Sequence, residues 1–243
     1  MCDGVQGVGV LFALIITLVF YAAAGWLWWQ QRNPLYILAL LASQLSTWLD
    51  PVWRLLYTLQ TVPGLGSLIA ALATPFDPIR SLPAAWPDPL PALIIVGLYL
   101  YRWWTPGLGS GLFTFVVFVS FQLLISILNL RPATPPLLLQ TLPFGVRVEL
   151  LAALMSATMS YGLCYVFLTV QNYSWPSMAV AILPMPTLFS VLIYGVIGAP
   201  LLIGRLLPDG EWPGRIGLIL TIALLGWCVY IISSALNRLD RWR

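Results

Sequence analysis

Long apolar stretches with almost no charge divide the chain, and their lengths predict helices that cross a membrane. A bilayer core of about 30 Å needs roughly 20 apolar residues in a helix. Stretches of this kind predict spans at 8–29, 34–49, 90–104, 112–130, 150–170, 178–203 and 216–236. The stretch 34–49 is short and stops at Asp50, so we expect six spans with this one as a seventh. The predicted fold is an all-α polytopic transmembrane helix bundle, with residues 1–243 in a single domain.

The segment 51–75 departs from this pattern, because Pro and Gly interrupt its apolar residues. A helix that begins at Pro51 would lay Trp53 and Tyr57 into the membrane interface, while Arg54 extends its guanidinium toward water. We therefore expect short interfacial helices in this segment rather than a full crossing.

Tryptophan side chains gather at or just outside the ends of the predicted spans. Indole prefers the headgroup zone of a bilayer, where its ring is in apolar surroundings and its N–H stays hydrated. A soluble core gives no reason for such clustering. The residues concerned are Trp26, Trp28, Trp29, Trp48, Trp103, Trp104, Trp175, Trp212 and Trp242.

The composition supports the membrane interpretation. Hydrophobic residues make up 60% of the 243 residues and charged residues only 8%, whereas a soluble domain carries about 25% charged residues. The net charge of +3 is small, so we expect no nucleic-acid partner. The expected surroundings are a lipid bilayer, with the chain as a multi-pass membrane protein.

The residue types that are missing exclude several kinds of chemistry. The chain has no histidine and no lysine. Histidine-ligated haem, His-based metalloproteases, Ser-His-Asp triads and lysine Schiff bases are therefore excluded. The three cysteines, Cys2, Cys164 and Cys228, lie far apart and form no metal or redox motif. We predict no catalytic residue, no cofactor and no metal, and we favour a protein that is not an enzyme.

Asp-Pro pairs are the most regular motif, and each precedes a predicted helix. Asp accepts hydrogen bonds from the first amides of a helix, and Pro fits the first helical position because an N–H there has no partner anyway. Capping alone explains the pairing, so we interpret these residues as architecture rather than as a functional site. The motif residues are Asp50, Pro51, Arg54, Asp77, Pro78, Arg80 and Asp88.

A polar stripe on the span 112–130 is the second candidate site. Gln122, Ser126 and Asn129 are spaced i, i+4, i+7 and share one helix face. One interpretation is a polar path or a ligand pocket. The interpretation we favour is hydrogen bonding to serines and threonines of neighbouring helices, typically about 0.6 kcal/mol per pair. No charge lies in the middle of a predicted span, which argues against an ion-coupled transporter.

Three short motifs follow one another between residues 39 and 104. They are Thr-Trp at 47–48, Pro-Ile-Arg-Ser-Leu-Pro at 78–83 and Asp-Pro-Leu-Pro at 88–91. These motifs resemble one repeat of the YggT family of small bacterial and plastid membrane proteins, which shows Arg-x-x-x-Ser-Trp, then Pro-Ile-Arg-Arg-x-Ile-Pro, then Asp-x-Ser-Pro; Ser43 stands at the arginine position. The resemblance implies a non-enzymatic role in organising or assembling membrane complexes, or in tolerance of osmotic stress. It also implies a bacterial inner membrane, or an organelle membrane of bacterial descent, as the location.

Three functions fit these observations to different degrees. The first is a non-catalytic structural or assembly subunit of a larger membrane complex, with other membrane proteins as partners. The alternative is a transporter or channel for an uncharged or lipidic solute that uses the Gln122 face. A membrane enzyme of lipid or isoprenoid metabolism comes third, because such enzymes usually show acidic or histidine clusters.

We predict a cytoplasmic C-terminus, because Arg238, Arg241 and Arg243 cluster there and basic residues favour the cytoplasmic side. A reporter protein fused after Arg243 should be active in its cytoplasmic form. A fusion that is active only on the outer side of the membrane contradicts this topology.

Overall fold

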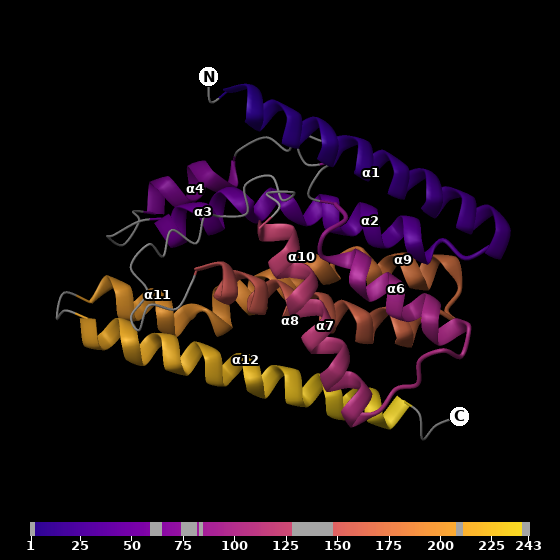
Figure 1. The fold of residues 1–243 in the computed structure, drawn as a ribbon. Helices are drawn as coiled ribbons and strands as arrows, with labels where there is room; N and C mark the ends of the chain where they lie inside the picture. The colour runs from indigo at the N-terminus through magenta and orange to yellow at the C-terminus, as the bar shows by residue number, and fades with distance from the viewer. Residues whose placement is uncertain are drawn as a thin grey trace.

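The structure, a computed structural model, describes residues 3–58, 65–73, 82, 85–127, 148–207 and 211–239. Every regular element in these ranges is a helix, which confirms the predicted all-α class (Figure 1). The α-helices are α1 (Asp3–Gln31), α2 (Leu35–Ser46), α3 (Asp50–Thr58), α4 (Leu65–Leu72), α6 (Pro89–Leu100), α7 (Leu108–Ile127), α8 (Val148–Val170), α9 (Trp175–Ile182), α10 (Met185–Ser190), α11 (Ala199–Leu206) and α12 (Glu211–Leu239). A 3₁₀ turn, η1 (Thr47–Leu49), joins α2 to α3, and a π-helix, η4 (Val191–Ile197), follows α10.

Five helical runs among the described residues are long and apolar enough to cross a membrane, which is compatible with a membrane location. They are Leu35–Tyr57, Leu108–Ser126, Leu150–Val170, Trp175–Ile197 and Trp212–Leu239. Helix α6 is apolar but has only 12 residues, where the sequence predicted a span over 90–104. Residues 59–64 and 74–75 of the predicted interfacial segment 51–75 lie outside the described residues. So do residues 128–130 of the predicted span 112–130.

The first of these runs passes through Asp50 and Pro51, where the sequence predicted that the helix stops. The 3₁₀ turn η1 tightens the helix just before Pro51, whose missing N–H removes one hydrogen bond without ending the helix. Ser46 Oγ and Thr47 Oγ1 donate to carbonyl oxygens three residues earlier, at 2.7 Å each. Helices α2 and α3 therefore form one continuous helical run.

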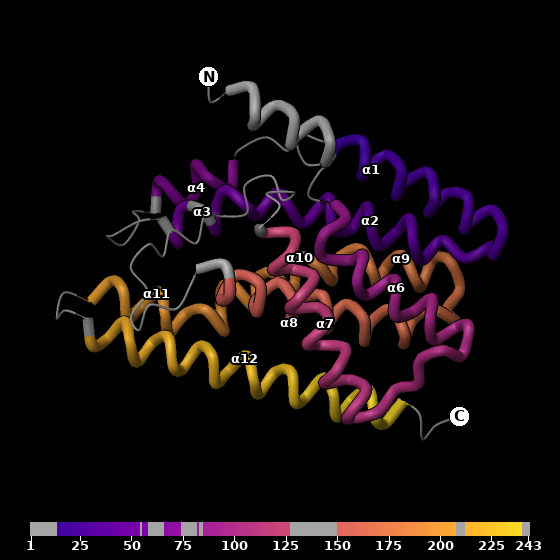
Figure 2. The backbone as a smooth tube through the Cα atoms, in the orientation of Figure 1, coloured from indigo at the N-terminus to yellow at the C-terminus, as the bar shows by residue number. Residues whose placement is uncertain are grey.

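Helix α8 lies between α2 and α12 (Figure 2) and packs against α6, α7 and α12. Most of its residues are buried, so the neighbouring helices must approach it closely on nearly all sides. Small residues such as Ala157, Ser160 and Gly162 permit this approach. A Cβ on Gly162 would collide with the Phe189 ring of α10, so a larger residue there would push the two helices apart.

Helices α11 and α12 pack in antiparallel fashion through two reciprocal glycine contacts. A Cβ on Gly204 of α11 would collide with the backbone carbonyl of Pro213 in α12. A Cβ on Gly217 of α12 would likewise collide with the backbone carbonyl of Pro200 in α11. Each helix thus places a glycine opposite a proline of the other, and the two backbones touch directly. Glycine-mediated contact of this kind is typical of helices that pack in lipid.

We predict that Gly217→Ala destabilises the protein, whereas Gly226→Ala on the same helix does not. The added methyl at position 217 meets a backbone atom that cannot rotate away, and overpacking of this kind costs about 1–3 kcal/mol. A Cβ at Gly226 meets nothing within 4 Å, and Ala is favoured over Gly in a helix by up to about 1 kcal/mol.

The measurement is reversible unfolding in mixed detergent micelles, followed by circular dichroism. If Gly217→Ala is as stable as Gly226→Ala, the backbone contact between α11 and α12 is wrong.

Candidate functional site

Gln122 stands at the junction of three segments in the interior of the molecule. Its side chain is 2% exposed, and its Nε2 donates hydrogen bonds to the carbonyl oxygen of Pro87 (2.9 Å) and to Ser160 Oγ of α8 (3.2 Å). Of the other residues predicted on this face, Ser126 is half-buried and Asn129 lies outside the described residues. Gln122 therefore connects α7 with α8 and with the segment that precedes α6.

Trp53 and Tyr57 of α3 are buried against α10 and η4, whereas the sequence predicted them in the interface. Trp53 Nε1 donates to Ser190 Oγ at 2.7 Å, and Tyr57 Oη donates to the carbonyl oxygen of Tyr194 at 2.7 Å. Tyr194 Oη lies 3.1 Å from Ser156 Oγ, and either hydroxyl can donate. The polar tips of α3 are thus paired inside the protein.

Arg205 of α11 adds a positive charge to this region. Its Nη1 donates to the carbonyl oxygen of Tyr57 at 3.1 Å, in the last turn of α3, where the helix dipole favours a cation. Partial burial lowers the pKa of Arg205 below its ordinary value, and the nearby Tyr57 opposes this shift. We call these hydrogen-bonded groups, together with the Trp53–Ser190 pair whose indole ring packs against Tyr194, the interior polar network. It comprises Gln122, Ser160, Ser156, Tyr194, Tyr57, Trp53, Ser190 and Arg205.

Glycines at the π-helix make room for the two aromatic side chains of α3. A Cβ on Gly198 would collide with Tyr57 Oη, and one on Gly195 would come within 3.3 Å of the Trp53 ring. A π-turn is wider than an α-turn and is often found at functional sites. Here the wide turn and its glycines let α3 approach closely enough for the Tyr57 hydroxyl to reach a backbone carbonyl.

The structure places the Asp-Pro motif residues in different surroundings. Asp88 is at the N-cap position of α6, with Pro89 following, but its side chain makes no capping hydrogen bond. Asp50 lies inside the continuous run Leu35–Tyr57 rather than at a free helix start. Both residues have polar or electrostatic contacts with their surroundings. Residues Asp77, Pro78 and Arg80, and the side chain of Arg54, lie outside what the structure describes.

The segment 85–88 lies in the interior, a placement that the sequence analysis missed. Trp86 is buried, and its ring lies 5.4 Å from Phe20 of α1 and 6.5 Å from Phe121 of α7, measured between ring centroids. Among the described residues, Trp86 Nε1 and Gln122 Oε1 are buried without a hydrogen-bond partner. Nothing in the sequence marked this placement, because Trp86 stands four residues before the predicted span 90–104, as Trp212 does before 216–236.

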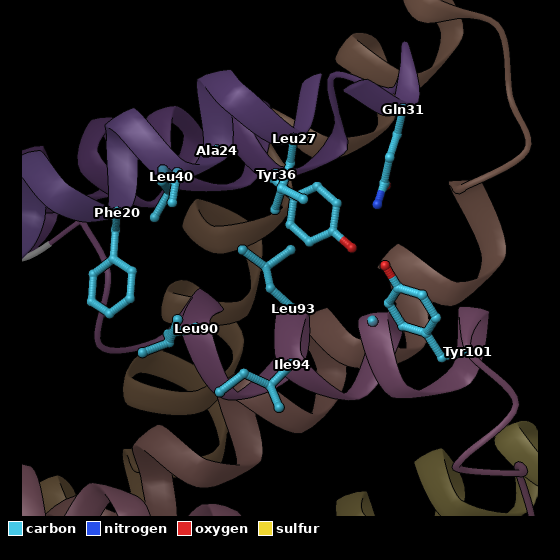
Figure 3. Close-up of a pocket in the computed structure, with 12 residues that line it drawn as sticks. Phe20, Ala24, Leu27, Gln31, Tyr36, Leu40, Leu90, Leu93, Ile94 and Tyr101 are labelled. Carbon is cyan, nitrogen blue, oxygen red and sulfur yellow. The ribbon is translucent and has the colours of Figure 1, made fainter. Parts of the chain in front are cut away.

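A groove of about 280 Å³ lies between α1, α2 and α6 (Figure 3), and we call it the α1/α6 groove. Apolar side chains line most of its length, including Phe20, Leu90 and Leu93. At one end, the hydroxyl groups of Tyr36 and Tyr101 point toward one another, and the Gln31 side chain points to the same end. The groove is therefore amphipathic along its axis.

The chain matches no protein-family model, no curated protein sequence and no solved structure. The resemblance of residues 39–104 to the YggT family stays a prediction.

We predict that Ser190→Ala lowers the free energy of unfolding by about 1–3 kcal/mol, because it leaves the Trp53 indole N–H buried without its acceptor. The matched control is Ser120→Ala. Ser120 is exposed and donates to the carbonyl oxygen of Val116 in its own helix, so its loss should be neutral or slightly stabilising.

A second variant separates the hydrogen bond from packing. Adding Trp53→Phe to Ser190→Ala removes the unpaired donor, so the two substitutions should be less destabilising together than their sum. Strict additivity in detergent unfolding would show that the Trp53–Ser190 bond contributes nothing.

Proposed function

We propose that the chain is a non-catalytic multi-pass membrane protein that serves as a structural or assembly subunit of a larger membrane complex. The five long apolar helical runs support a multi-pass arrangement. Helix α1, with 29 residues, is long enough for a sixth crossing. The short helix α6 would pack among the crossing helices without spanning the membrane itself. The resemblance to YggT proteins favours the same assembly role.

The interior polar network supports a structural role. Its hydrogen bonds join α3, α7, α8, α11 and the π-helix η4, so its polar atoms are engaged in holding helices together. Among the described side chains of the network, Arg205 alone is charged, and its charge is directed at a helix C-terminus. Acid–base chemistry needs a titratable group aimed at a substrate, and the network offers a set of neutral bridging groups instead.

The observation that carries the subunit role lies on the outer face of α12. Trp227 and Tyr230 are 68% and 63% exposed there, one helical turn apart, and neither has a hydrogen-bond partner among the described residues. At about 1.5 Å per residue, Trp227 lies near the middle of the apolar run Trp212–Leu239. Indole and phenol groups normally stay at the headgroup level, where water reaches them.

In the middle of a bilayer, the indole N–H and the phenol O–H would face hydrocarbon. An unpaired polar group of this size costs roughly 2–7 kcal/mol in an apolar medium. A partner helix that supplies an acceptor removes this penalty and covers two large aromatic rings, which are the side chains that most often dominate protein interfaces. The exposed serine of α7 offers a contrast, because Ser120 satisfies its hydroxyl on its own helix.

A transporter for an uncharged or lipidic solute is the second candidate. The observation that favours it is the buried Oε1 of Gln122, which has no partner among the described residues and would accept a hydrogen bond from a polar solute. Reconstituted vesicles distinguish the two functions, because a subunit alone gives no solute flux.

We predict that the chain, extracted from its native membrane in a mild detergent, has a particle mass well above the 26.9 kDa of a monomer. The double variant Trp227→Ala and Tyr230→Ala should reduce recovery of the same partner at least roughly tenfold. Trp212→Ala is the matched control, because Trp212 is an exposed tryptophan at the end of the same helix and should leave recovery unchanged.

The measurement is native mass spectrometry, with each partner chain identified by its peptides. A wild-type chain recovered only as a monomer, or equal loss with Trp212→Ala, contradicts the proposed interface. A monomer that also conducts a solute in vesicles favours the transporter.

A further inference from the structure

We propose that the α1/α6 groove holds one acyl chain of an anionic phospholipid from the surrounding bilayer, with the phosphate headgroup at Arg32 and Arg102. This inference depends on the proposed crossing of the membrane but not on the subunit role. Its support is the length of the groove, its polarity along its axis and the charge at its polar end.

The length of the groove matches one leaflet of a bilayer. On α1, the lining residues run from Phe20 to Gln31, which is about 16 Å at 1.5 Å per residue. Half of a hydrocarbon core of about 30 Å is about 15 Å. Phe20 packs on the buried Trp86 at the inner end, so the groove ends near mid-depth rather than passing through the molecule.

The polarity of the groove matches a lipid that enters from the side. Ile94 and Tyr101 line the groove and are themselves exposed, so it opens laterally between α1 and α6. Its apolar part suits an alkyl chain, and the facing hydroxyls of Tyr36 and Tyr101 suit the ester oxygens that follow the chain in a phospholipid (Figure 3). A purely apolar solute would leave these hydroxyls unused.

Charge at the polar end selects an anionic headgroup. Arg32 and Arg102 follow the lining residues Gln31 and Tyr101 directly in the chain, and both side chains are exposed. The carboxylates whose side chains the structure describes, Asp50 and Asp88, lie at the far ends of α2 and α6. Two guanidinium groups without a neighbouring described carboxylate complement a phosphate.

The backbone at both arginines strengthens this assignment. Arg32 and Arg102 have φ angles of 54° and 60°, the left-handed region in which a residue with a Cβ is strained. At Arg102 the bonds Trp103 N–H to Leu98 (2.9 Å) and Arg102 N–H to Tyr99 (3.0 Å) close the end of α6. Glycine is the usual residue at this position of such a helix end. An arginine there, at both helix ends beside one groove, has a strained backbone and indicates that the charge has a use.

The test is native mass spectrometry of the full-length chain in mild detergent with added phosphatidylglycerol or phosphatidylcholine of identical acyl chains. We expect the wild-type protein to bind its first phosphatidylglycerol molecule with a dissociation constant roughly 25-fold lower than that of its first phosphatidylcholine molecule. Each arginine contributes a factor of about five, and the two factors multiply. Arg32→Gln with Arg102→Gln should abolish this preference. Arg238→Gln, which removes an exposed arginine from the last turn of α12, should retain it.

A second pair of variants tests the groove itself. A Cβ on Gly97 would lie 3.9 Å from Tyr36 Oη, an ordinary contact, so Gly97→Ala should bind lipid almost as wild type does. Gly97→Leu extends a side chain into the groove and should weaken phosphatidylglycerol binding at least tenfold, with an unchanged unfolding midpoint.

Several results overturn the proposal. Equal binding of the two lipids by wild-type protein, or an equal effect of Arg238→Gln, removes the role of the two arginines. Equal binding by Gly97→Leu and Gly97→Ala places the lipid elsewhere. A preference that the double glutamine variant retains and that only Gly97→Leu removes shows that groups other than the two arginines select the headgroup. If Gly97→Leu unfolds, the arginine comparison still decides. None of these readouts requires a partner protein, so they can fail while the subunit role stands.

Discussion

Hydrogen bonding of buried polar groups is the constraint on which the arrangement of these helices depends. Helices pack in lipid without the hydrophobic driving force that water provides, so close backbone contact and polar bonds between helices must hold them together. Both devices occur here. Glycines bring α11 and α12 into backbone contact, and the interior polar network ties α3 to η4, and Gln122 of α7 to α8. Tyr57 combines the two, because its hydroxyl reaches the Tyr194 carbonyl only where Gly198 leaves room.

The all-α class and the presence of helices long enough to cross a membrane were predictable, because they depend on the length and apolarity of stretches such as those in α8 and α12. Helix ends at proline were less predictable. Pro51 removes one backbone hydrogen bond, but a 3₁₀ turn with tighter hydrogen bonding precedes it, so the helix continues. An amphipathic pattern also does not tell whether its apolar face meets lipid or protein. Trp53 and Tyr57 fit an interfacial helix by pattern, yet Ser190 and Tyr194, more than 130 residues away, provide their partners.

The candidate sites show the same difference between local features, which the sequence predicts, and contacts between distant segments, which it does not. The i, i+4, i+7 spacing identified the face on which Gln122 lies, because periodicity on one helix is a local property. It did not identify Pro87 as its acceptor, because that contact depends on where the segment 85–88 passes in three dimensions. The α1/α6 groove was not predictable either. Its lining comes from three helices, and the sequence gives no signal for a gap between two of them.

The short length of α6 explains both the groove and the position of Gln122. A helix of 12 residues rises about 18 Å, about 60% of the length needed to cross a bilayer core. The segment before it lies inside the molecule, where Pro87 has a backbone carbonyl that needs a donor, and Gln122 supplies one. On its other side, α6 diverges from α1 enough to leave a groove that ends at Phe20 and Trp86. A full-length helix in this place would remove the acceptor and the groove together, so the two features have one structural cause.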